Sequence, residues 1–505
     1  MKKSLSQAIA LATLVGAAAS ANAMNVNPDG QGEAFLMPLY TADNGNVTTL
    51  NVTNTTDKIK AVKVRFLEGM NSKEVLDFNL YLSPYDQWSA AVGLDANGTP
   101  RIYTEDTSCT VGAIPAAGQP FVNVAYREDT NSDAPAAYKT IERAKVGHVE
   151  LIEMGEINPD APLVTRSGNT ITARYAIVHN TNPAKPNQPG DCSAVSDAFK
   201  AGGLWASDTN AQVTAPKGGL YATGAVLNVD GGWQSSYDAV ALDNTAPTTV
   251  GVTGPRQFKP GSELPNFQNF NNNVAFKNGF TGTTDDGNDI DENVNAVSAL
   301  LMKESIQNDY VVGAGLNAQT DLTITFPTKT FYVNGVVDAD DVHEAAAPFG
   351  NRIRKGWDRN KGMACEAVTI RYWDHEENES VLDVSEFSPS EDAEAITLCH
   401  ETNILSVSGS KAIGGEGFVR HNLDLKAGFN IGWLDIDFLE RASGSVTETY
   451  RAIPVTGTGS TSDFVMYGLP VIGFSTIVIQ NGDVGGLMSN YAATYEHKAT
   501  TSVDF

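Results

Sequence analysis

Alternation of apolar and polar residues with a period of two is the feature that most limits what this chain can fold into. Between residues 46 and 94, apolar runs of this kind are separated by short turn sequences such as Ser83-Pro84-Tyr85-Asp86. Because successive side chains of a strand point to opposite faces, the pattern predicts antiparallel strands with one buried face. The apolar positions are Leu50 and Val52, then Val62, Val64 and Phe66, then Leu76, Phe78, Leu80 and Leu82, then Trp88, Ala90 and Val92.

Similar runs continue toward the C-terminus, and three short segments have a helical pattern instead. Strands at this spacing, separated by turn residues, are typical of β-sandwiches. We therefore predict a mainly β protein made of antiparallel β-sandwich domains with a few short helices. The further strand candidates are residues 121–124, 149–154, 175–178, 220–229, 322–333, 404–407, 429–438, 446–451, 464–467 and 471–479, and the helix candidates are residues 136–145, 193–201 and 295–305.

The first 23 residues have the organisation of a secretory signal peptide. Lys2 and Lys3 precede an apolar stretch of about a dozen residues, too short to cross a bilayer, and Ala21-Asn22-Ala23 fits a cleavage site. We expect export to the cell surface, the extracellular space or the periplasm, with a mature chain that begins at Met24. No later stretch reaches about 18 uninterrupted apolar residues, so no transmembrane helix is predicted.

A change of composition near residues 209–219 indicates a domain boundary, because polar residues there are followed by Pro216-Lys217-Gly218-Gly219. We predict a signal peptide at 1–23, an N-terminal β-sandwich domain at 24–215 and a C-terminal β-rich domain at 216–505. The formal charge of −26 excludes nucleic acid as an expected partner, since phosphates bind cationic surfaces. A second copy of the chain, a cell-surface component or a glycan remains as the expected partner.

The cysteine count indicates disulfides. An even number of cysteines in an exported chain favours two bridges, and the lack of a C-x-x-C spacing argues against zinc. Three pairings are open. We prefer Cys109 with Cys192 and Cys365 with Cys399, because each bridge then lies within one predicted domain.

An acidic, glycine-containing segment at residues 285–293 is the strongest candidate for a metal site. Calcium takes six to eight oxygen ligands, which Asp285, Asp289 and Asp291 could supply together with backbone carbonyls. The spacing lacks the glutamate that closes an EF-hand loop, so a solvated acidic loop is the alternative. No other cofactor is expected.

Signatures of known enzyme classes are absent. The chain has no G-x-S-x-G, H-E-x-x-H or P-loop motif, and its seven histidines are scattered. Glu150 and Glu153 are a pair of carboxylates, but residues three apart on a strand point to opposite faces and do not converge. We therefore expect no catalytic residues and no enzymatic activity.

Four stretches carry a resemblance to a group of exported cell-surface proteins of Gram-negative bacteria. They begin at Asn25 (NVNPDGQGEAFLMPLY), Lys60 (KAVKVRFLEGMNSKEVLDFNLYLSPYDQW), Gly147 (GHVELIEMGEI) and Gly218 (GGLYATGAVLNV), with a weaker fifth at Thr325 (TFPTKTFYV). The resemblance implies an exported surface protein. It implies no enzyme chemistry and supplies no catalytic or binding residues.

Two hypotheses of function follow, with a hydrolase of unfamiliar site as a weaker third. The first is a structural or adhesive surface protein. Self-assembly is one form of it, in which residues 33–40 pair with the sheet edge of a neighbour, the alternative being that they form a strand of their own sheet. The second is a module that binds a glycan or another extracellular ligand through exposed tryptophans. The candidates are Trp205, Trp233, Trp357 and Trp373, with core positions as the alternative.

Overall fold

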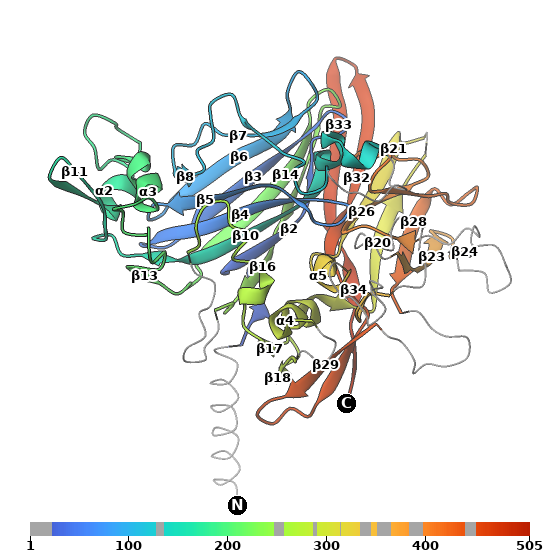
Figure 1. Ribbon diagram of the computed structural model, residues 1–505. Coiled ribbons are helices and arrows are strands. Elements are labelled where there is room, and N and C mark those ends of the chain that lie inside the picture. The colour runs from blue at the N-terminus through green and yellow to red at the C-terminus, as the bar shows by residue number, and fades with distance from the viewer. Residues whose placement is uncertain are drawn as a thin grey trace, which may run out of the picture.

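The computed structural model is mainly β, with antiparallel sheets and a few short helices (Figure 1). This part of the fold prediction is confirmed. The finer prediction of β-sandwich domains is corrected, because the sheets are arranged more like the four blades of a propeller than like a sandwich. Alternation shows which face of a strand is buried, but it does not show which sheet covers that face. The structure describes residues 23–127, 136–246, 257–285, 290–313, 315–333, 345–350, 365–382, 397–439 and 451–505.

An eight-stranded sheet is formed mainly by the N-terminal half. Its strands β4 (Ile59–Glu68) and β10 (Val146–Ile157) pair along their length, and every residue of β4 is buried. The Lys63 and Arg65 face of β4 is therefore inside the protein, although alternation predicts a single buried face. The strand order is β1 (Asn25–Val26), β16 (Val240–Asp243), β2 (Ala34–Thr41), β10, β4, β5 (Glu74–Leu82) and β8 (Cys109–Val111), with β13 (Val213–Thr214) paired to β10.

A six-stranded sheet shares a hydrophobic core with the first one. Leu50 and Val52 of β3 (Asn46–Asn54) pack in one cluster with Val64 of β4, and Trp88 of β6 (Gln87–Leu94) is fully buried in the same cluster. The apolar face predicted for residues 50–92 is thus the core face. The strand order is β15 (Trp233–Asp238), β14 (Leu220–Asn228), β3 (Asn46–Asn54), β6 (Gln87–Leu94), β7 (Pro100–Tyr103) and β9 (Gln119–Pro120).

Three five-stranded sheets follow in the C-terminal half. The first, which we call the central sheet, is β27 (Arg420–Leu423), β26 (Thr402–Val407), β21 (Ala318–Thr325), β32 (Ile472–Val484) and β33 (Leu487–Glu496). The second is β24 (Glu379–Leu382), β23 (Thr369–Asp374), β28 (Ile431–Asp437), β20 (Ser305–Val311) and β34 (Lys498–Thr500). The third is β17 (Asn273–Ala275), β18 (Thr281–Thr283), β29 (Ala452–Gly457), β30 (Phe464–Tyr467) and β35 (Ser502–Asp504).

The central sheet separates two hydrophobic cores. On β26, Ile404 belongs to the core of the N-terminal sheets, while its neighbour Leu405 belongs to the C-terminal core. On β32, Phe474 faces the first core and stacks on Tyr237 of β15 with ring centroids 4.8 Å apart. Both faces of the central sheet are therefore packed at β26, where every residue is buried, and its side chains connect the two halves of the chain.

Strands from beyond residue 215 complete the N-terminal sheets, because β14 pairs with β3 and β16 pairs with β2. The sheets thus cross the predicted division, and the division itself stays a prediction. The segment considered for strand donation, residues 33–40, lies mostly in β2, which is fully buried between β16 and β10. In this chain it is a strand of its own sheet.

Both preferred disulfides are present. Cys109 is bonded to Cys192 across 83 residues, and Cys365 is bonded to Cys399 across 34 residues. The first joins β8 to α3 (Cys192–Ala198) and so fastens a small helical cluster to the edge of the eight-stranded sheet. None of the described helices is long and apolar enough to cross a membrane.

Candidate ligand-binding face

The paired carboxylates of β10 point to opposite faces, as predicted, and each is bound by a protein cation. Arg65 donates to Glu150 at 2.6 Å, while Lys60 donates to Glu153 at 2.9 Å. Burial raises the pKa of both carboxyl groups, that of Glu153 to about 7, although Lys60 acts in the opposite direction. The two groups do not converge on a common space where a substrate could lie.

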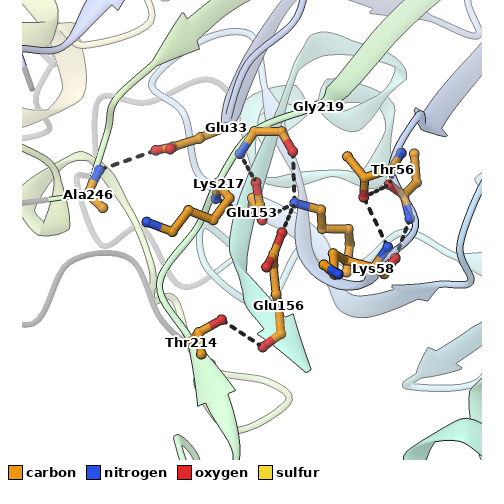
Figure 2. Close-up of polar contacts among 12 residues, drawn as sticks. Glu33, Thr56, Lys58, Glu153, Glu156, Thr214, Lys217, Gly219 and Ala246 are labelled. Carbon is orange, nitrogen blue, oxygen red and sulfur yellow. Dashed lines mark hydrogen bonds and ion pairs between the residues drawn. The ribbon is translucent and has the colours of Figure 1, made fainter. Parts of the chain in front are cut away.

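The surroundings of Glu153 show what this acid does (Figure 2). Its other oxygen accepts a hydrogen bond from the Gly218 amide at 2.9 Å, and Lys60 also contacts Glu156 at 2.9 Å. The segment around residue 218 is the chain that leads into β14. The buried cluster therefore fixes this connection against β10 and β4, and its polar groups are satisfied by the protein itself.

The predicted calcium loop is described in part. Asp291 is the N-cap of α4 (Glu292–Leu301), and its side chain accepts a hydrogen bond from the Asn293 amide at 2.9 Å. The Asp285 carbonyl accepts from Asn295 at 2.7 Å, and Asp289 lies outside the described residues. Among the residues that the structure describes, no three His, Cys, Asp or Glu side chains are placed to hold a metal ion. Calcium binding stays a prediction.

The tryptophans named as ligand candidates have different positions. Trp205 and Trp233 are buried in hydrophobic clusters, and Trp357 lies outside the described residues. Trp373 is half-buried on the outer face of β23 and has a partner that sequence reasoning missed. This partner is Trp433 of β28, which is 40% exposed.

Trp373 and Trp433 are directly opposite each other in the antiparallel pair β23–β28. Their ring centroids are 4.1 Å apart and the ring planes differ by 10°, so one face of each indole covers the other. Gly432 permits this close pairing, because a Cβ at that position would lie 1.8 Å from the Trp373 carbonyl oxygen. The register of the sheet and the glycine at position 432 therefore hold the two rings in their stacked position.

Polar side chains surround the stacked rings on the same face. In the register of the sheet, Asp309 of β20 is opposite Trp433, and Glu379 of β24 is opposite Trp373. Both carboxylates are exposed. We call this outer surface, with the neighbouring row described next, the aromatic face; it comprises Asp309, Trp433, Trp373, Glu379, Gln307, Asp435, Arg371 and Val381.

The neighbouring row is held by hydrogen bonds. Asp435 accepts from Gln307 at 2.7 Å and from Arg371 at 2.8 Å, one on each of its oxygens. The hydrogen bond to Asp435 raises the pKa of the Arg371 guanidinium. These bonds fix three side chains of neighbouring strands beside the indole pair, so the polar groups of the face are ordered before any ligand arrives.

The chemistry of the aromatic face is that of a binding surface. Indole rings supply apolar contact area at low entropic cost, and adjacent carboxylate, amide and guanidinium groups supply donors and acceptors. A hollow of about 310 Å³ lies near one end of β28, between residues 312–319 and 407–430. Of the described residues that line it, Lys426 alone is charged, so these residues supply no pair of groups for acid and base catalysis.

No protein-family model matches this chain, and neither a curated protein nor a solved structure is similar to it at a significant level.

Proposed function

We propose that the chain is an exported, non-catalytic surface protein that works by contact, and that its aromatic face binds a neutral glycan. The observation that carries this proposal is the stacked pair of Trp373 and Trp433 on a solvent-facing sheet. Sugar rings present apolar C–H groups that pack on aromatic rings, while their hydroxyls need the donors and acceptors found beside this pair. The sequence hypothesis of an adhesive protein and that of a glycan-binding module thus describe one activity.

The carboxylates on the aromatic face favour an uncharged glycan over an anionic one. Asp309, Glu379 and Asp435 lie on the face, and the whole chain has a formal charge of −26. The cation beside the rings, Arg371, is already paired with Asp435 at 2.8 Å. Uronic acids and sulfated sugars would meet repulsion there, whereas an uncharged sugar can use the carboxylates as hydrogen-bond acceptors.

The proposed location outside the inner membrane is supported by two features. The N-terminal 23 residues fit a signal peptide, and two disulfides are present. Disulfides persist in oxidising compartments. A protein in such a compartment that binds glycans without turning them over would attach a cell to a surface or a matrix.

A glycan array that contains neutral, anionic and cationic polysaccharides tests the proposal. Binding is expected to neutral glycans, and Trp433→Ala should weaken it about tenfold or more, since stacking on one indole contributes on the order of 1 kcal/mol beyond its buried area. Tyr221→Ala is the matched control, because Tyr221 is a strand residue of similar exposure, 37%, on another sheet. Absence of neutral-glycan binding, or equal binding by the Trp433 variant, contradicts the proposal.

A further inference from the structure

The central sheet ends in a long strand whose outer edge has no partner among the described strands. β33 contains ten residues, whereas the other terminal strands of the large sheets contain two to six. Alternate backbone amide and carbonyl groups of an edge strand point away from its sheet. Such a row is a template for pairing with another chain.

The side chains of β33 are uncharged from Leu487 to Tyr495, several of them are apolar, and Glu496 ends the strand. Leu487 and Tyr491 are 72% and 62% exposed, and Met488 and Tyr495 are exposed as well. From Val484 to Tyr495 the sequence contains no charged residue and no proline. Proteins usually protect an edge strand by shortening it or by adding lysine or proline, and β33 has none of these protections.

The hairpin of β32 and β33 is held in place by the rest of the protein. Asn490 donates to the Gly231 carbonyl at 2.6 Å, and Thr494 hydrogen-bonds with Ser235 of β15. Ala492 packs against the N-terminal core. These contacts use the face of β33 that points to β15, and in Figure 1 the hairpin stands between the N-terminal and C-terminal sheets with its tip at the top of the view. The edge is thus fixed in position and needs little ordering when it binds.

We propose that β33 pairs antiparallel with β33 of a second copy of this chain and joins the two central sheets into one. The net charge of the chain favours a second copy as the partner of this edge. Each copy has a formal charge of −26, so two copies repel each other over most of their surfaces and can meet best where neither is charged. A cationic partner would prefer the acidic faces instead. Antiparallel pairing of one edge with itself is also self-complementary about a two-fold axis, which closes the assembly at a dimer.

Sedimentation velocity of the full chain at increasing concentration tests the dimer. The dimer fraction should rise with concentration, and it should rise further with added salt, because salt screens the repulsion between acidic copies. Tyr491→Lys places two like charges near the two-fold axis and should raise the dimer dissociation constant at least tenfold. Tyr85→Lys is the matched control, since Tyr85 is a comparably exposed tyrosine, 72% against 62% for Tyr491, in the turn between β5 and β6.

A thiol cross-link locates the contact. All four cysteines are bonded in disulfides, so Tyr491→Cys adds a single free thiol. Mild oxidation should convert this variant into covalent dimers and leave Tyr85→Cys monomeric. The inference is overturned if the unmodified chain stays monomeric at every concentration and salt level, or if its dimer constant is the same with Tyr491→Lys. Neither result bears on glycan binding, which uses a different sheet.

Discussion

Lys60 and Glu153 form an ion pair of 2.9 Å in which neither side chain is exposed to solvent. Removing one member of a buried pair leaves an uncompensated charge, which typically costs about 3–5 kcal/mol. We expect Lys60→Met to lower the free energy of unfolding by that order, as measured by denaturant titration. The double variant Lys60→Met/Glu153→Leu should recover part of the loss. A single variant as stable as the parent would contradict the role assigned to this pair.

The pH dependence of stability should carry a contribution from Glu153. Burial raises the pKa of this carboxyl from an ordinary 4.5 to about 7. The folded chain therefore retains a proton that the unfolded chain releases, and this contribution is present below about pH 4.5 and is lost as the pH rises through about 7. Glu153→Gln cannot titrate. Relative to this variant, the parent should lose stability between those pH values, and a difference that does not change with pH would contradict the assignment.

Gly432 should not tolerate a side chain. A Cβ there would lie 1.8 Å from the Trp373 carbonyl oxygen, so β28 and β23 would have to separate. We expect Gly432→Ala to destabilise the chain by about 2 kcal/mol or more and to weaken glycan binding along with the tryptophan stack. Gly315→Ala is the control, because its Cβ would have no neighbour within 4 Å. Equal melting temperatures for the two variants would contradict the prediction.

The disulfide between Cys109 and Cys192 should contribute strongly to stability. It closes a segment of 83 residues, and on the chain-entropy model such a closure stabilises the fold by about 4.5 kcal/mol, as an upper guide. Replacing both cysteines by serine should lower the melting temperature and loosen α3 first. Calorimetry combined with hydrogen exchange of residues 192–198 checks both effects. An unchanged melting temperature would show that the closure has no energetic role.

The local sequence pattern predicted several secondary-structure elements correctly and others wrongly. The apolar positions predicted between residues 50 and 92 are buried, apart from the partly buried Leu76, because strands in this region are long and alternating. The predicted strand at 175–178 is mostly α2 (Ala173–Ile177), whose first turn is capped by Thr172. The end of the predicted strand at 322–333 is α5 (Lys329–Val333). Short apolar runs do not distinguish a strand from a helix without their tertiary partners.

The candidate site could be predicted only in part. Trp373 was a candidate because an exposed indole can bind a ligand, yet its partner Trp433 is 60 residues away in sequence, and only the register of β23 with β28 brings them together. The open edge of β33 could not be predicted either, because the sequence does not show which strand lies at the end of the central sheet. Sequence alternation indicates a strand, but it does not show which other strands pair with it.

The central sheet has a consequence for how the protein responds to force and heat. Because Ile404 and Leu405, adjacent on one strand, belong to different cores, neither half can melt without exposing a face of the other. The chain should therefore unfold in a single calorimetric transition that includes both halves. A load applied to one half would likewise pass through the packed central sheet to the other half.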